Sequence, residues 1–149
     1  MLKGSVPIES DWGNFKDDFD IEDAYLKFSG KSNEYIQKEL KNNALELMEL
    51  YRFIPEVPFS YYFVGLVNFI NSGNFSDVDA ADITSYFIDV VEYILKTEPD
   101  KILPLVDIVM NSIEHIALNQ KKYHAQVDVY GDYMIKYLNI RDLFYSDSL

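Results

Sequence analysis

The chain has 149 residues, a length that fits one domain with a single buried core. Hydrophobic residues make up 48% and charged residues 26%, a globular composition that argues against disorder throughout. The formal net charge of −12 disfavours nucleic acids and anionic membranes as partners and favours basic proteins.

Cysteine is absent, which excludes disulfides, thiol chemistry and thiolate zinc sites and is typical of a reducing compartment. The N-terminal residues lack the apolar stretch of a secretory signal. The longest apolar run, residues 59–70, is too short to span a bilayer. We therefore expect a cytoplasmic protein that does not enter a membrane.

The first thirty or so residues combine an irregular arm with a short helix. Residues 1–20 have no sustained period and predict an arm pinned by Trp12, Phe15 and Phe19. A short helix is expected over residues 21–28, ended by Ser29 and Gly30. Ser32 is then a candidate N-cap for a helix that runs to about residue 51.

The segment from Pro58 to Lys96 predicts two helices of opposite character. The first is apolar on nearly every side, so the rest of the fold should bury it. The second begins after Ser76, and its apolar face includes Ile83, Phe87 and Val90. Its other face carries aspartates and tyrosines, for which the sequence offers no obvious partner within the chain.

Two more helices are expected, one from about residue 101 through Ile116 and one from about Lys121 to Leu138. Residues 139–149 are expected to form a loosely docked tail. Because no segment alternates like a strand, residues 1–149 predict a single all-α domain, a bundle of about five to seven helices. Alternate helices start about 43–45 residues apart, an interval found in HEAT-like α–α stacks, but the units share little residue-level similarity, so an irregular bundle with short antiparallel connections is the main expectation and HEAT-like stacking the alternative.

Patterns of catalytic or metal-binding residues are missing from this sequence. Neither His115 nor His124 has a carboxylate at the spacing of zinc or di-iron helices, and there is no nucleophile elbow or phosphate loop. Asp77, Asp79 and Asp82 lack the glycine and glutamate of a calcium loop, so they indicate favourable charge at a helix start. We expect a non-enzymatic protein with no cofactor and no metal.

The strongest candidate site is the outward stripe of the helix that follows Ser76. Tyrosine offers contact area with few rotatable bonds, and aspartate attracts and pairs arginine or lysine. At helical spacing these residues fall within one stripe or beside it. The predicted partner-binding residues are Asp79, Asp82, Tyr86, Asp89, Glu92 and Tyr93. The alternative is that the tyrosines pack on neighbouring helices and the aspartates are simply solvated.

Two secondary candidates lie elsewhere. One is the acidic and aromatic run of the arm, with Asp17, Asp18, Asp20 and Asp23. Its alternative interpretation is an arm whose aromatic rings dock on the core while its acids face water. The other is the pair Tyr61 and Tyr62, which could instead belong to the core.

In its acidic, helical character the chain resembles bacterial immunity proteins that neutralise polymorphic or contact-dependent growth inhibition toxins. Tyr61-Tyr62 is similar to the helix-borne tyrosine pair of colicin nuclease immunity proteins. The resemblance implies a cytoplasmic binding protein whose partner is a cognate, basic toxin domain, commonly a nuclease. It also implies that the acidic surface covers the toxin's catalytic cleft or blocks its approach to nucleic acid. A helical-repeat scaffold that binds a peptide or another protein is the alternative.

Overall fold

A computed structural model gives the structure of the protein and describes residues 4–146. Within that range every regular element is helical. The longer helices are α1 (Phe19–Phe28), α2 (Asn33–Tyr51), α3 (Glu56–Ser72), α4 (Asp77–Thr97), α6 (Val106–Leu118) and α8 (Tyr133–Tyr145). The short elements are α5 (Pro99–Ile102), α7 (Val127–Tyr130) and 3-10 turns at Glu9–Trp12, Phe15–Asp17, Leu103–Leu105 and Gln120–Tyr123. The expected all-α class is confirmed.

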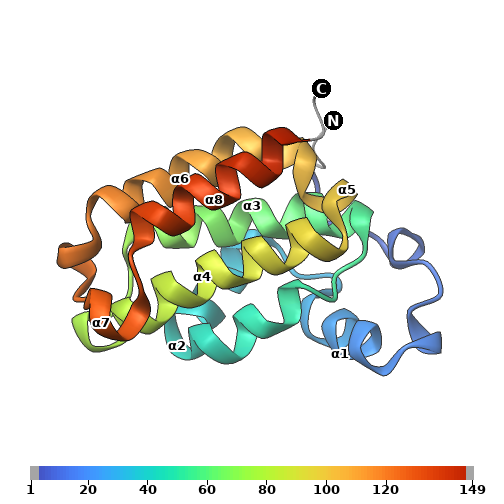
Figure 1. Cartoon of the computed structure of the whole chain (residues 1–149). Helices are drawn as coiled ribbons and strands as arrows, with labels where there is room; N and C mark the ends of the chain where they lie inside the picture. The colour runs from blue at the N-terminus through green and yellow to red at the C-terminus, as the bar shows by residue number, and fades with distance from the viewer. Residues whose placement is uncertain (1–3, 147–149) are drawn as a thin grey trace.

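Successive long helices alternate between two layers (Figure 1). Helices α2, α4 and α8 lie side by side in one layer, and α3 and α6 form the layer behind them. Helix α2 packs on α3 and α4, while α6 packs on α3 and α8. This order of contacts places α4 in the middle of the front layer, and α4 itself packs mainly on α2, α5 and α8.

Helix α3 forms the centre of the core. Phe59, Phe63 and Leu66 are fully buried, and α2, α5, α6 and the N-terminal arm all contact this helix. Each such side chain stabilises the fold by about 1.5–3 kcal/mol through burial. The expectation that the rest of the chain packs around this apolar helix is confirmed.

The predicted helix starts are capped as expected. The Ser32 hydroxyl accepts a hydrogen bond from the Tyr35 amide at 3.2 Å, and the Ser76 hydroxyl accepts one from the Asp79 amide at 3.2 Å. Helix α3 ends at Gly73, whose φ of 64° is the left-handed conformation that glycine adopts without strain. Each serine cap contributes about 1 kcal/mol.

The arm is only partly as predicted. Trp12 and Phe15 are buried, but Phe19 is 88% exposed. Phe19 is the first residue of α1, and Ala24 and Phe28 form the buried face of that helix. At about 100° per residue these two lie on the side of α1 opposite Phe19, so the helix turns this ring toward solvent.

The prediction of one helix from Lys121 to Leu138 with a loose tail was wrong. The chain turns at His124, whose φ is 60°, forms α7, and turns again at Gly131, whose φ is 80°. Asp132 then caps α8 by accepting a hydrogen bond from the Met134 amide at 2.9 Å. Helix α8 extends to Tyr145 and buries Ile140 and Phe144 in the core. The end of the predicted tail, residues 147–149, lies outside the described residues.

Candidate partner-binding surface

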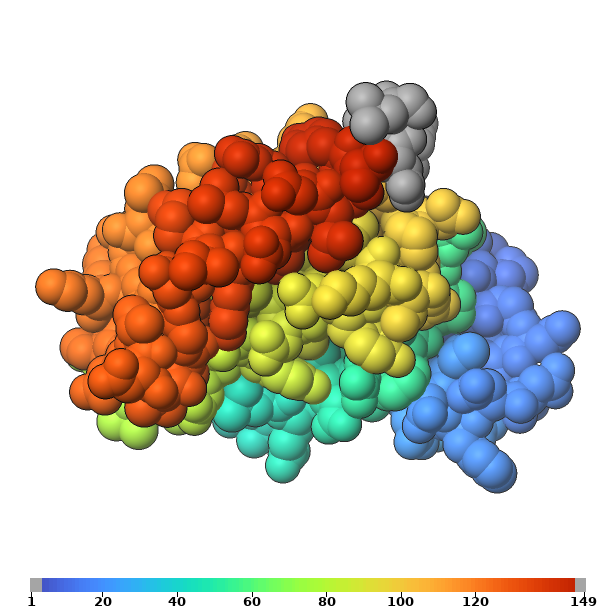
Figure 2. Space-filling model, viewed as in Figure 1, coloured from blue at the N-terminus to red at the C-terminus, as the bar shows by residue number. Residues whose placement is uncertain are grey.

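The predicted stripe lies on the outward side of α4, between α2 and α8. Asp82 and Asp89 are exposed on the solvent-facing side of the helix, and Tyr93 is 46% exposed. Tyr86 is half-buried against the hydrophobic core. The stripe is therefore a surface of exposed carboxylates beside tyrosine rings that the fold holds in place. Figure 2 shows α4 running across the exposed front of the molecule.

Tyr86 and Tyr93 lie on the side of the stripe that faces α2. The Arg52 guanidinium carbon lies 5.3 Å from the centre of the Tyr93 ring, which is a cation–π contact. Burial raises the pKa of Tyr86, and the nearby Glu49 carboxylate raises it further, while Arg52 opposes both. The tyrosine side of the stripe thus faces the acidic outer surface of α2.

Asp82 and Asp89 lie on the side of the stripe that faces α7 and α8. The Tyr130 hydroxyl donates a hydrogen bond to Asp82 at 2.7 Å. Partial burial raises the pKa of Asp89, and Glu92 raises it too, whereas Lys136 of α8 lowers it. The stripe therefore does have a hydrogen-bonding neighbour within the chain, contrary to expectation. This neighbour could not be predicted because the sequence pattern had placed Tyr130 within one continuous helix.

The flanking residues Asp79 and Glu92 are held by local contacts. Asp79 accepts a hydrogen bond from the Ser76 hydroxyl at 3.1 Å, and Glu92 pairs with Lys96 at 3.6 Å. Asp79 is exposed at the start of α4. Both carboxylates stay on the outside of α4 and add to the negative charge of the stripe.

A hollow lies at each end of the line where α2 and α4 meet. The first, of about 660 Å³, forms where α2 kinks at Asn43, a residue with φ of −143° and ψ of 55°. Glu46 of α2 and Asp79 of α4 both line it. We call the surface between the two hollows the α2–α4 seam. Its residues are Glu46, Glu49, Arg52, Asp79, Asp82, Tyr86, Asp89 and Tyr93.

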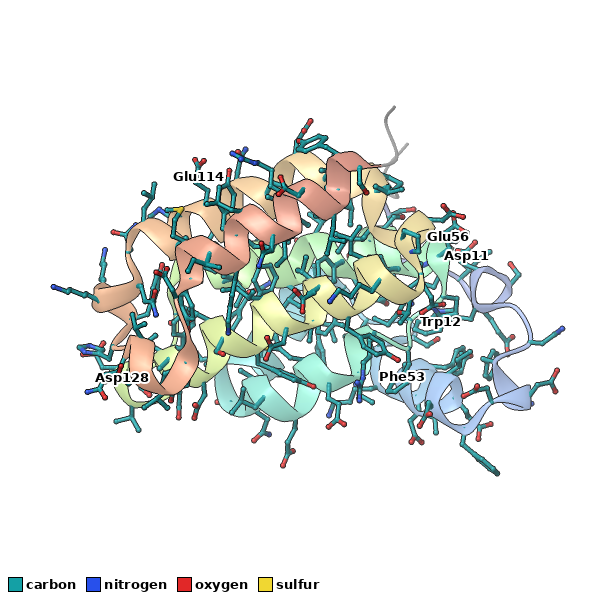
Figure 3. The ribbon with its side chains drawn as sticks, viewed as in Figure 1. Asp11, Trp12, Phe53, Glu56, Glu114 and Asp128 are labelled. Carbon is teal, nitrogen blue, oxygen red and sulfur yellow. The ribbon has the colours of Figure 1, made fainter. Side chains whose placement is uncertain are left out.

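The second hollow, of about 590 Å³, joins parts of the chain that are distant in sequence. Asp18 and Asp20 line it from the arm and from the first turn of α1, opposite residues 97–101 and residues 52–56. Phe53 and Glu56 of its wall lie at the end of the molecule where Trp12 of the arm packs (Figure 3). The structure thus brings part of the acidic arm next to one end of the seam, while Asp17 and Asp23 are exposed and do not line this hollow.

Lys101, which also lines the second hollow, is buried and paired. Its ammonium group donates hydrogen bonds to the Arg52 carbonyl at 2.8 Å and to Glu98 at 3.0 Å. It also lies 5.2 Å from the centre of the Phe59 ring. Burial lowers its pKa, and Glu98 opposes that change. Lys101 therefore ties α5 to the α2–α3 loop.

The tyrosine pair of α3 has a structural role. The buried Tyr62 hydroxyl donates to the Phe28 carbonyl at 2.6 Å and to the Lys31 carbonyl at 2.8 Å. The Tyr61 hydroxyl accepts a hydrogen bond from the Asn33 amide at 3.0 Å. Tyr62 therefore holds the end of α1 and the α1–α2 loop against α3, and Tyr61 holds the start of α2. Tyr62 is thus not available to a partner in this structure, which corrects its place among the candidates.

Sequence reasoning missed Glu46 and Glu49 as members of the site. Both are exposed on α2, and Glu49 pairs with Arg52 at 3.3 Å. Their spacing of three residues puts them on one polar face of α2, which the sequence does show. It could not show that this face lies beside the stripe of α4, because that contact joins segments far apart in the chain.

Among residues 4–146, no group of three or more His, Asp or Glu side chains is placed to hold a metal ion. His124 lies 3.8 Å from Asp77, and His115 contacts Asn119, the residue that follows α6. Over the same range, no helix has both the length and the apolar character needed to cross a membrane.

Comparison of this chain with protein-family models, with curated proteins and with solved structures finds no match.

Proposed function

We propose that this chain is a non-enzymatic binding protein that captures a basic protein domain through the α2–α4 seam. The observation that carries the proposal is the seam itself: Glu49 of α2 and Asp89 of α4 are exposed close to Tyr86. The half-exposed Tyr93 continues the same stripe. Because the chain's acidic, helical character resembles that of toxin-immunity proteins, we propose that the partner is a basic nuclease-type toxin domain. The protein would act in the cytoplasm, where such a toxin meets nucleic acid.

Attraction and contact contribute at different steps of binding. A surface with five carboxylates and one arginine, in a chain whose net charge is −12, raises the rate of encounter with a basic domain, and added salt screens that attraction. The tyrosine rings are already held by Arg52 and by the core, so they lose little freedom when a partner covers them. Their burial would slow dissociation.

Neutralisation follows from the chemistry of nucleases. A nuclease binds its substrate largely through arginine and lysine contacts to phosphate. Carboxylates spread along α4 and α2 would occupy the same basic groups. A bound copy of this protein would therefore exclude RNA or DNA whether it covers the catalytic residues or only the path to them.

The test begins with the partner captured by the tagged protein from its native cells in low salt. The purified partner is then titrated calorimetrically against wild type and against a variant with Glu46→Lys and Asp89→Lys. We expect binding to weaken by about 100-fold or more, because reversed charges turn attraction into repulsion. The matched control, Asp107→Lys with Asp128→Lys, makes the same charge change at exposed positions off the seam and should lose far less.

Equal affinities for the seam variant and the control would contradict the proposal. Protection provides a second readout that separates immunity from simple binding. Cells that express the captured domain should survive with wild type and with the control variant, and die with the seam variant. If the captured domain harms no cell, the partner is not a toxin, although the seam would still be its binding surface.

The two-layer stacking of the helices favours a second candidate, a helical-repeat scaffold that binds a peptide along the same seam. The two functions differ in their response to salt. Capture of a basic domain should weaken steeply between 50 and 300 mM salt, whereas apolar peptide docking in the hollows should change little.

A further inference from the structure

The outward face of α1 combines large apolar side chains with acids. Phe19 is 88% and Leu26 69% exposed, and Asp23, which lies between them on the same face, is exposed too. Glu22 flanks this line on its other side and is partly exposed. The buried side of the helix lies opposite, so the packing of α1 on the core leaves this face open to solvent. We call Phe19, Glu22, Asp23 and Leu26 the α1 outer face.

A third hollow lies at the other end of the molecule, beside α7 (Figure 1). It has a volume of about 910 Å³ and forms between the end of α6, the 3-10 turn that follows it and the start of α7. The exposed side chains of Leu118 and Val127 give it apolar walls. Lys121 and Lys122 also line it, and Asp128 is the only acid in its lining. Two lysines and one aspartate leave the hollow with a net positive charge.

The third hollow is preformed, because the side chain of Gln120 holds the loop around it. The amide nitrogen of this side chain donates hydrogen bonds to the carbonyls of Ala125 at 2.9 Å and Gly131 at 2.7 Å. Its carbonyl oxygen accepts one from the Tyr133 amide at 2.9 Å. The two lysines are exposed, and within residues 4–146 neither forms an ion pair. A partner therefore meets a fixed surface and loses little affinity to ordering of the loop.

The α1 outer face and the third hollow are complementary. Each combines two exposed apolar side chains with a pair of like charges, and the pairs are opposite in sign: Glu22 and Asp23 on the helix, Lys121 and Lys122 at the hollow. In a chain of net charge −12 the hollow is a local exception. A helix with an apolar outward face docks in an apolar groove, and opposite charges fix its orientation there. A second copy of this chain supplies such a helix.

We propose that the α1 outer face of one copy docks in the third hollow of the next copy, head to tail. The two surfaces lie at opposite ends of the molecule, so one contact leaves a free α1 and a free hollow (Figure 2). Repeated contacts therefore build open chains of molecules. One short helix buries less area than a standard interface, so the association is weak and appears at high concentration. It uses no residue of the α2–α4 seam and does not depend on the function proposed for that seam.

Sedimentation velocity on the full chain between 20 and 500 μM in 150 mM salt tests the association. We expect the wild type to show dimers and larger species at 500 μM. Lys121→Glu with Lys122→Glu should stay monomeric, because acid then faces acid. The matched control, Lys38→Glu with Lys41→Glu, makes the same charge change at exposed positions of α2 and should associate nearly as well as the wild type.

An exchange of charges separates direct contact from net charge. Glu22→Lys with Asp23→Lys should also abolish association, because lysines then face lysines. A chain with all four substitutions keeps the net charge of −12 but sets the lysines of α1 against glutamates at the hollow. This chain should associate again. Circular dichroism shows whether each variant keeps its helix content.

A mixture of two defective variants tests the head-to-tail geometry. Phe19→Asn with Leu26→Asn removes the apolar part of the α1 outer face at exposed positions and leaves the hollow intact. The double lysine variant has the opposite defect. Each should be monomeric alone. An equimolar mixture should form dimers and nothing larger, because only one of the two contacts of each molecule is intact.

Three results would overturn the proposal. The first is a wild type that stays monomeric at 500 μM. The second is a chain with all four charge substitutions that does not regain association. The third is association that is lost with Glu46→Lys and Asp89→Lys but kept with Phe19→Asn and Leu26→Asn, which would mean that the seam of one copy occupies the hollow of the next. Since these measurements include no other protein, none of them contradicts the capture of a basic domain.

Discussion

At the scale of single residues, Asn33 and Gly65 determine how closely α2 approaches α3. The Asn33 side-chain amide donates to the Tyr61 carbonyl at 3.0 Å, and Gln37 donates to the Gly65 carbonyl at 2.7 Å. A Cβ atom on Gly65 would overlap the Asn33 side chain. Glycine in the middle of a helix costs about 1 kcal/mol relative to alanine, so the close contact must offset that cost.

We therefore expect Gly65→Ala to lower the free energy of unfolding by about 1–3 kcal/mol, although alanine is the better helix former. Urea denaturation gives the value. In an Asn33→Ala background the overlap with the carboxamide is removed and only the Cβ contact at 3.3 Å remains, so the same change at Gly65 should cost less. A Gly65→Ala protein more stable than wild type would show that α2 and α3 do not meet as closely as described.

The tyrosine pair of α3 gives a second test at this scale. Tyr62→Phe removes the donor from the carbonyls of Phe28 and Lys31 and should cost about 1–3 kcal/mol of unfolding free energy. Tyr61→Phe makes the same chemical change on a partly exposed ring and should cost less, about 1 kcal/mol or below. Equal losses would mean that Tyr62 is as accessible as Tyr61.

At the scale of elements, the features that depend on neighbouring residues could be predicted from the sequence, whereas those that depend on long-range contacts could not. Serine caps, helical periods and the buried character of α3 follow from neighbouring residues, so they could be inferred from the sequence. The outward stripe of α4 could be inferred for the same reason. The neighbours of that stripe, Glu49 and Tyr130, reach it only through tertiary packing, which no local pattern contains.

Helix α8 shows why the C-terminal boundary was missed. Tyr123, Tyr130 and Tyr137 recur at intervals of seven residues, which predicted one helix, while Gly131 and Asp132 between them form a turn and a cap. Glycine inside an apparently helical pattern, followed directly by a capping residue, was the local signal of this break.

The docked end of α8 leads to a prediction for this element. Phe144 is buried, so Phe144→Ala should lower the free energy of unfolding by about 3–5 kcal/mol through lost burial and the cavity it leaves. Tyr145→Ala removes a half-exposed ring one residue later and should cost far less. Thermal and urea denaturation of both variants give the comparison. A negligible cost at Phe144 would restore the interpretation of a loose tail.

At the scale of the whole molecule, charge and apolar surface are segregated. The carboxylates of the seam lie on α2 and α4, whereas α8 presents a nearly neutral apolar stripe. The proposed capture of a basic partner would therefore use one face of the domain and would weaken as salt rises.

Tyrosines provide a global response to alkaline pH. Burial raises the pKa of Tyr51, Tyr62, Tyr123 and Tyr133, and hydrogen bonds to Asp82 and Glu114 raise those of Tyr130 and Tyr137. All of these pKa values lie above the ordinary 10.0 in the folded state. As pH rises past that value, the unfolded chain releases these protons first. Stability that is present below pH 10 is then lost.

We expect the free energy of unfolding to change little between pH 8 and 9.5 and to fall steeply toward pH 11, measured by urea denaturation at each pH. Lys101 acts in the opposite sense, because its lowered pKa makes stability rise with pH below 10.5, but it is one group against several. Absorbance at 295 nm should show most tyrosines ionising together with unfolding. Tyr51 is the informative variant, since its buried hydroxyl has no hydrogen-bond partner among residues 4–146. Tyr51→Phe should therefore cost little at pH 8 and make the alkaline loss shallower, whereas tyrosines that titrate near pH 10 in a protein that stays folded would contradict this explanation.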